Sequence, residues 1–211
     1  GEGKIDATGY GIAGTLTWYG NDGLYLDGQA KLTWYDSDLS STTANQSLAS
    51  GNDGRGYALS IEAGKRIPVR PDWFFTPQAQ LAWSRVDFDG FSDGFDADVT
   101  LHDGDSLLAR MGLALDHERE WQDSLGQTRR IHAYGLANLY YDFDNATTID
   151  VASTPFTTKN EPLWAGIGIG GSYNWNNDKY SLYGQALAKT SIDNFADSNI
   201  ISGNIGLRVR W

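Results

Sequence analysis

Apolar and polar side chains alternate along most of this 211-residue chain, and this period-two pattern constrains the fold more than any other feature. Residues two apart in a β-strand lie on the same face of a sheet. Within residues 24–35, one face carries Leu and Trp side chains while the other carries Asp, Gln, Lys and Thr. Similar alternation recurs in residues 73–84, 107–115, 131–139 and 163–174, and less regularly in residues 10–19, 57–67 and 180–189. With a last strand ending at Trp211, about nine strands can be placed.

The hydropathy of the chain fits a membrane barrel and excludes a helical membrane protein. No segment approaches the roughly 20 consecutive apolar residues that a membrane helix needs, and the mean hydropathy is −0.43. A barrel strand needs only about 10 residues with every second one apolar. The content of 25 Gly, 5 Pro and 13% aromatic residues favours long β-hairpins. The sequence therefore predicts one all-β domain over residues 1–211, a transmembrane antiparallel up-and-down β-barrel.

The connections between these strands alternate in length, as in outer-membrane barrels with short periplasmic turns and longer extracellular loops. Short links are expected at residues 20–23, 68–72 and 176–178, and longer polar ones at 36–55, 89–98 and 144–161. The link at residues 117–127 is predicted to be periplasmic although it spans roughly ten residues. Aromatic residues near strand ends are expected to form two interfacial girdles. One comprises Trp18, Tyr25, Trp73, Trp175, Tyr180 and Trp211, and the other comprises Trp34, Trp83, Tyr141 and Trp164.

The odd number of strands predicts that part of the barrel is contributed from outside this sequence. Bacterial single-chain barrels close with an even number of strands, because an open edge is not tolerated in lipid. An alternative is a tenth strand within the 144–161 connection, where residues 147–151 could pair.

Charge and motif content exclude several other classes of function. A net charge of −11 argues against nucleic-acid binding, which needs clustered Lys and Arg. No phosphate-binding Gly loop, zinc-ligand spacing or cysteine is present, so no cofactor or metal is expected. Catalysis is not expected, because His117 and His132 fall in a predicted turn and on the predicted lumen face. His102, near Asp103 and Asp105, is the only plausible catalytic candidate.

Several motifs resemble the C-terminal β-domain of monomeric autotransporters, the translocator of type V secretion. The resemblance covers nearly the whole chain and is carried by TGYGIAGTLTW at 8–18, GLYLDG at 23–28, WFFTPQAQL at 73–81, ARMGL at 109–113 and LYG at 182–184. It implies a twelve-stranded barrel with a helix in its pore, of which about three N-terminal strands and the helix are absent here. It further implies an integral outer-membrane protein that exports and anchors an N-terminal passenger, with a periplasmic C-terminus.

The same resemblance implies a C-terminal signal that the barrel-assembly machinery recognises. Asn204, Gly206, Val209 and Trp211 match this signal. The simpler interpretation is that the last strand needs apolar side chains toward lipid, and both can hold. The implied partners are outer-membrane lipid, the assembly machinery, and the passenger with its linker helix.

Polar residues of the predicted strands are expected to face a hydrated lumen that could hold a polar helix. This predicted lumen set comprises Asp27, Lys31, Glu62, Arg66, Gln78, Gln80, Arg110, Asp116, Asn138, Asp142, Lys189, Arg208 and Arg210. For any single residue, an ordinary water-facing strand position is the favoured explanation. The alternative that stays open is a small autonomous outer-membrane barrel, which could be a porin, an adhesin or an outer-membrane hydrolase. A soluble β-sandwich is disfavoured by the long strands and by the aromatic residues clustered at their ends.

Overall fold

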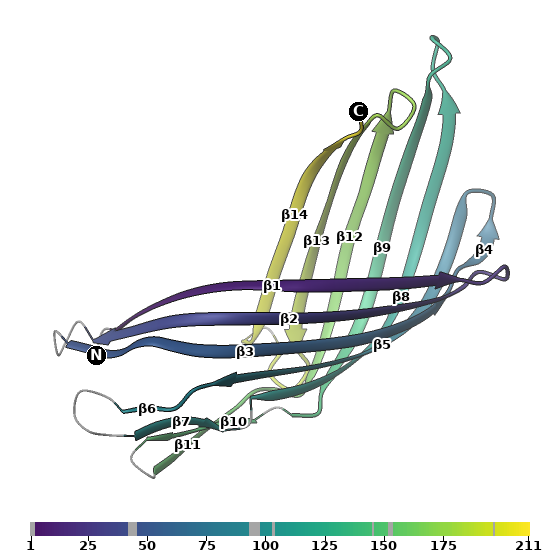
Figure 1. Ribbon diagram of the computed structural model, residues 1–211. Coiled ribbons are helices and arrows are strands. Elements are labelled where there is room, and N and C mark those ends of the chain that lie inside the picture. Colours follow the sequence, from purple (N-terminus) through teal and green to yellow (C-terminus); the bar gives the residue numbers. More distant parts are fainter. Residues whose placement is uncertain are drawn as a thin grey trace.

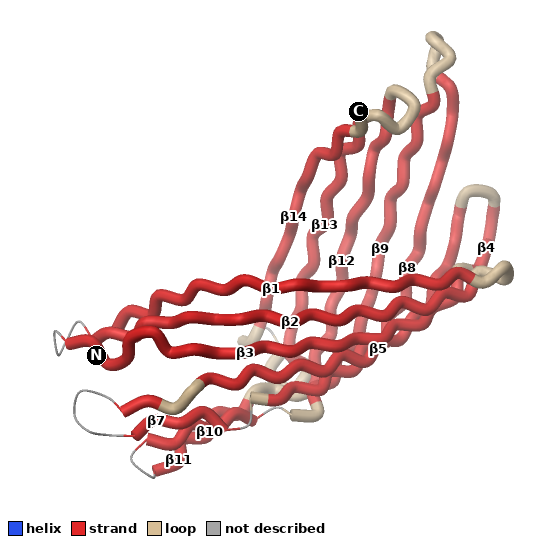
Figure 2. Tube along the Cα trace, viewed as in Figure 1, coloured by secondary structure: helices blue, strands red, loops and turns tan. Residues whose placement is uncertain are grey.

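The computed structural model describes residues 3–41, 46–92, 98–102, 104–144, 146–151, 154–195 and 197–211. These residues form strands and their connections, and no helix occurs among them (Figures 1 and 2). The strands are β1 (Gly3–Tyr19), β2 (Leu24–Ser41), β3 (Gln46–Lys65), β4 (Ile67–Arg70), β5 (Trp73–Phe88), β6 (Phe91–Ser92), β7 (Asp98–His102), β8 (Asp105–Gln122), β9 (Thr128–Asp142), β10 (Ala146–Val151), β11 (Thr154–Lys159), β12 (Leu163–Trp175), β13 (Tyr180–Ser191) and β14 (Asn199–Val209). Within the described part, no helix is long and apolar enough to cross a membrane.

Nine long strands form the main sheet in the order β1-β2-β3-β5-β8-β9-β12-β13-β14, and the short β4 pairs with β5. Each strand of this path pairs antiparallel with the next one along the path, which is an up-and-down topology. The prediction of an all-β antiparallel fold with about nine strands is confirmed. The sheet curls into a half-barrel whose edge strands, β1 and β14, do not pair with each other (Figure 1).

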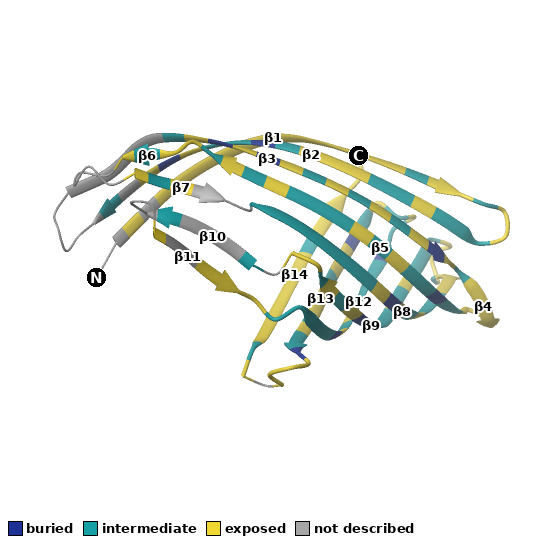
Figure 3. Ribbon diagram, turned by 90° about the horizontal axis from the view of Figure 1, so that it is seen from below, coloured by how far each residue is buried: buried dark blue, intermediate teal, exposed yellow. Residues whose placement is uncertain are grey.

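The two faces of the main sheet have opposite polarity, because apolar and polar residues alternate along each strand. Large apolar side chains are exposed on the outer face, including Leu113 at 50% and Ile167 at 69%. No apolar side chain among the described residues is buried, whereas Thr76, Asn138 and Ser181 are. The alternation of exposure along the strands is visible in Figure 3. A soluble protein buries its apolar face, so this arrangement fits a sheet whose outer face contacts lipid.

Tight turns connect the strands at the end of the sheet where the chain reaches Trp211. Four residues that adopt positive φ in these turns are not glycine: Asp72, Asn176, Asn177 and Asp178. The prediction of a ten-residue link at 117–127 was wrong. Residues 117–122 continue β8 and pair with residues 128–133 of β9, so the turn occupies only residues 123–127.

The predicted loops at the opposite end are largely strand. β2 and β3 extend into the 36–55 connection and pair there, with residues 42–45 outside the described part. β6, β7, β10 and β11 form a separate four-stranded sheet, called the loop sheet below, in the order β11-β10-β7-β6. Residues 147–151, considered as a tenth barrel strand, pair in this loop sheet instead. Parts of the predicted 89–98 and 144–161 loops, at residues 93–97, 145 and 152–153, lie outside the described residues.

Candidate functional site

The concave face of the main sheet carries rows of polar side chains that run across neighbouring strands. The register fixes these rows, because Cα partners on adjacent strands point to the same face. One row joins six strands through Thr17, Asp27, Glu62, Gln80, Arg110 and Tyr140. In this row, acidic, neutral and basic groups of β2, β3, β5 and β8 lie side by side.

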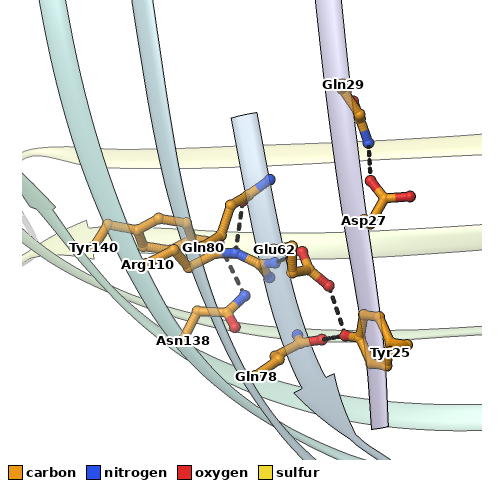
Figure 4. A network of polar contacts seen from close by, with 9 residues as sticks. All are labelled: Tyr25, Asp27, Gln29, Glu62, Gln78, Gln80, Arg110, Asn138 and Tyr140. Atoms are coloured by element: carbon orange, nitrogen blue, oxygen red, sulfur yellow. Dashed lines mark hydrogen bonds and ion pairs between the residues drawn. The ribbon is translucent and has the colours of Figure 1, made fainter. Parts of the chain in front are cut away.

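A hydrogen-bonded network on this face, called the Arg110 network below, links side chains of β2, β3, β5 and β8 (Figure 4). The Arg110 guanidinium donates to Gln80 Oε1 over 3.1 Å and, across β5, forms an ion pair with Glu62. The Tyr25 hydroxyl donates to Glu62 Oε1 at 2.6 Å and lies 3.0 Å from Gln78 Oε1. The Arg110 and Glu62 side chains are only 16% and 18% exposed. Contacts that reach across an intervening strand require the side chains to converge, which identifies this face as the concave one.

Asn138 and Lys189 lie beside the Arg110 network and meet at Tyr140. Asn138 Nδ2 donates to the Tyr140 hydroxyl over 3.0 Å, and Lys189 Nζ lies 5.0 Å from the centre of the Tyr140 ring. Gly112 stands between Gln78 and Asn138 in the register, and a Cβ there would collide with the Asn138 amide. A glycine at this position therefore lets two long polar side chains approach across the strand.

A second charged group lies nearer the turn end of the concave face. His132 Nε2 is 2.8 Å from Asp116 Oδ1, while Arg66 pairs with Glu118 at 2.8 Å. The Arg66 guanidinium also stacks 3.5 Å from the centre of the Phe74 ring. Arg66, Asp116 and His132 contribute to a hollow of about 460 Å³ on this face. Because charges of opposite sign alternate here, this part of the face has no large excess of either sign.

The remaining residues of the predicted lumen set do not join these groups. Asp27 accepts hydrogen bonds from Thr17 Oγ1 (2.5 Å) and Gln29 Nε2 (2.9 Å). Lys31, Asp142 and Arg208 lie opposite Ala13, Leu108 and Ser181 respectively. Arg210 follows β14, where its backbone N–H donates to Lys179 O over 2.8 Å.

Two aromatic residues assigned to the interfacial girdles lie on the concave face instead. Tyr25 is part of the Arg110 network, and Trp164 lies opposite Tyr140 in the register. The alternation already placed Tyr25 on the polar face, so its position near a strand end was misleading. On the outer face, Trp175 does stack with Tyr180 near the turns, with ring centres 5.5 Å apart.

On the concave face, two tyrosine rings lie over glycines of the neighbouring strand. A Cβ at Gly170 would collide with the Tyr134 ring, and one at Gly206 would collide with the Tyr183 ring. In the predicted C-terminal signal, Asn204 lies opposite Gln185 and Val209 opposite Tyr180, while Trp211 follows the end of β14. Gly206 thus has a packing role in addition to any role in recognition.

Replacing Gly206 with valine should destabilise the barrel by about 2 kcal/mol, because overpacking a filled site costs about 1–3 kcal/mol. The measurement is the free energy of unfolding in urea of the full-length protein folded in lipid bilayers. Tyr183→Ala in the same chain removes the ring and should restore most of this loss. A double variant no better than Gly206→Val would show that Gly206 does not act through the Tyr183 ring.

His117 and His132 do not join a metal-binding group within the described part of the chain. His117 packs its ring 4.7 Å from that of Trp73, and its Nδ1 is 3.1 Å from Asp72 O. His132 pairs with Asp116, and no three acidic, His or Cys side chains among the described residues converge as metal ligands. The side chain of His102 and the whole of Asp103 lie outside the description.

Comparison with known proteins identifies a family and several relatives of this chain. The family model described as "Autotransporter beta-domain" matches residues 1–187. The chain is 48% identical over 211 residues, its whole length, to the adhesin BmaC autotransporter of Brucella suis biovar 1 (strain 1330), and 28% identical over 160 residues (75% of the chain) to the pertactin autotransporter of Bordetella parapertussis. It spans only 6% and 17% of the lengths of these two relatives.

Solved structures show the same fold. The transport unit of the autotransporter AIDA-I from Escherichia coli superposes with a TM-score of 0.74, covering 99% of this chain and 68% of that one at 15% identity. The β-domain of the Bordetella autotransporter BrkA gives a TM-score of 0.60 at 19% identity and covers 96% of this chain and 71% of that one.

Proposed function

This chain belongs to the autotransporter β-domain family, and from that premise we propose that it forms the outer-membrane translocator that delivers an N-terminal passenger to the cell surface and anchors it there. The observation that carries this function is the inverted polarity of the curled sheet. Its apolar face is exposed and its polar side chains gather on the concave face. A sheet of this kind is suited to lipid outside and to a hydrated, polypeptide-wide passage inside.

The concave face is proposed to contact the passenger during export and its linker helix afterwards. The groups that support this role are the Arg110 network and the Arg66–Glu118 and His132–Asp116 pairs, because their mixed charges can bind a polar segment of either sign. The energy for export would come from passenger folding outside the cell. No group in this role needs to break a covalent bond, so the proposed function is not enzymatic.

We propose that the turn end of the sheet faces the periplasm and that the loop sheet lies outside the cell. Short turns on the periplasmic side and longer connections outside are the usual arrangement in outer-membrane barrels. This orientation places Trp211 at the periplasmic surface, where Asn204, Gly206, Val209 and Trp211 would be accessible to the barrel-assembly machinery during folding.

Closure of the barrel is proposed to involve further strands paired with β1 and β14. Their outer backbone edges have no partner among the described strands, and unpaired peptide groups are not stable in lipid. The same edges argue against the alternative of a small barrel, such as a porin, adhesin or hydrolase, that closes from these residues alone.

Surface display of the passenger tests the proposed function directly. In the full-length protein, deletion of residues 199–211, which removes β14, should abolish cleavage of the passenger by protease added to intact cells. Deletion of residues 146–158, a matched length within the loop sheet, should leave display in place because these residues lie outside the main sheet. Display that persists without β14 would contradict a translocator role for this chain.

A further inference from the structure

A hollow of about 610 Å³ lies on the outer, apolar face of β5, β8, β9 and β12. Its floor is formed by small residues of β9, namely Ala133, Gly135 and Ala137. In the register, Gly135 lies opposite Leu115 on β8 and Ile169 on β12, and Ala137 lies opposite Leu113. Large residues on both sides of a strand with small ones leave a trough along that strand.

The trough leads toward a cation near the turn end of β8. On the same face of this strand, the outward residues continue from Leu115 to His117, Arg119 and Trp121. Arg119 is exposed, lies opposite Ile131, and has no hydrogen bond or ion pair within the described part of the chain. The neighbouring Arg129 differs, because its guanidinium binds both Asp123 and Tyr173.

Aromatic rings flank Arg119 on both sides. The rings of Trp73 and His117 are 4.7 Å apart on the side of the trough, and those of Trp121 and Tyr173 are 6.3 Å apart on the side of the turns. Trp and Tyr concentrate at the level of lipid headgroups in membrane barrels. Arg119 lies on its strand between these two aromatic groups, so its charge is expected to lie at the boundary between hydrocarbon and headgroups.

An arginine at this boundary is stabilised by an anion that can accept its paired N–H groups. Guanidinium binds phosphate through two parallel hydrogen bonds. The acid nearest to it on the adjoining turn, Asp123, already accepts hydrogen bonds from Arg129 and from two backbone N–H groups. The negative charge that balances Arg119 must therefore come from outside the described chain. The trough beside Arg119 offers apolar surface from Ala133 to Ala137, which is roughly 13 Å at about 3.3 Å per residue.

We propose that Arg119 and this trough bind one anionic glycerophospholipid of the leaflet that surrounds the turn end. The lipid phosphate lies on the Arg119 guanidinium, and one acyl chain follows β9 over Ala133, Gly135 and Ala137. This site rests on the proposed function in one respect only: the outer face must be embedded in a membrane.

A second hollow, of about 650 Å³, on the outer face of β1, β2, β3 and β5 provides a matched control. Gly14, Gly28 and Ala30 contribute to its surface, and no charged residue does. A Cβ at Gly14 would have no neighbour within 4 Å, and one at Gly135 would have only Gly168 O at 4.0 Å. The Cβ of a valine at either position therefore meets no collision, and its methyl groups are expected to occupy the hollow.

Lipid retention by the full-length protein tests the proposal. Delipidated protein is incubated with phosphatidylglycerol or phosphatidylcholine, and bound lipid is counted by native mass spectrometry. The unmodified protein should retain one phosphatidylglycerol in preference to phosphatidylcholine. Both Arg119→Gln and Gly135→Val should lower this retention about tenfold. Gly14→Val should leave it unchanged. Arg55→Gln should also leave it unchanged, because Arg55 is exposed on the outer face, opposite Trp34, toward the other end of the sheet.

The proposal is overturned if Arg119→Gln retains phosphatidylglycerol like the unmodified protein, if Gly14→Val lowers retention as much as Gly135→Val, or if both lipids bind equally. Passenger display on intact cells is measured for the same variants and should be normal in all of them. Loss of specific lipid retention with normal display would leave the translocator function standing, whereas absence of display from the unmodified protein would refute that function independently.

Discussion

Arginine in place of Leu113 should destabilise the assembled barrel by about 3 kcal/mol, the cost of a cation on the lipid face near the bilayer midplane. Leu113 lies near the middle of β8 and is 50% exposed on the outer face. Arginine in place of the next residue, Ala114, should be tolerated. Ala114 contributes to the 460 Å³ hollow on the concave face together with Asp116, so the new charge there meets water and a carboxylate.

The comparison of these two variants is made on the full-length protein folded in bilayers of phosphatidylcholine. The free energy of unfolding in urea gives the magnitude, and retarded gel mobility after boiling reports whether a barrel has formed in cells. Equal stability of Leu113→Arg and Ala114→Arg would mean that the outer face of β8 is not in contact with hydrocarbon. Because the two positions are adjacent in β8, both variants place the charge at nearly the same point along the strand, and the face is the main difference between them.

Methionine in place of Arg110 should lower the free energy of unfolding by about 3 kcal/mol, since removal of one member of a largely buried ion pair leaves the charge of the other without its partner. Glu62 would then keep a charge in a site that is 18% exposed, and among the described residues the Tyr25 hydroxyl would be its one remaining donor. The double variant Glu62→Gln with Arg110→Met removes both charges and should recover most of the loss.

Arg85 offers a matched control for the Arg110 variant. It also pairs with carboxylates, those of Asp87 and Asp105, but its side chain is 49% exposed. Solvent screens such pairs, so Arg85→Met should change the unfolding midpoint little. An equal effect of Arg85→Met and Arg110→Met, measured in the same bilayers, would show that the concave network does not contribute as a buried ion pair.

The strands and the orientation of their faces were predictable, because alternation with a period of two over strands this long assigns each residue to one face. In β2, for example, the apolar residues from Leu24 to Trp34 are spaced two apart and therefore all lie on the same face of the strand. The family motifs pointed to the same fold. The contacts of the Arg110 network were not predictable, because a Glu62–Arg110 pair requires the register of β3 against β5 and of β5 against β8 to be known together.

The predictions from the sequence failed where one residue type is suited to two different environments. Tyrosine near a strand end suits both an interfacial girdle and a lumen hydrogen bond, and the position of Tyr25 in the chain does not distinguish them. Strand ends beyond the membrane were also missed. Residues 117–122 carry Glu, Arg and Gln, which read as a polar link, yet their backbone groups continue the β8–β9 ladder. The loop sheet depends on pairing between connections that are distant in sequence.

The pairing of β7 with β10 has a kinetic consequence for barrel assembly. These strands flank β8 and β9, so their ladder is a continuation of the hairpin that begins at the turn of residues 123–127. Once β8 and β9 have paired, Val99 and Val151 need to close only a short remaining loop, and the entropy lost is small. We therefore expect the β7–β10 ladder to form after the β8–β9 ladder, as the last step in the formation of this hairpin. The hairpin could then withdraw only after this outermost ladder had opened. Formation of the β7–β10 ladder would therefore slow the reversal of hairpin insertion.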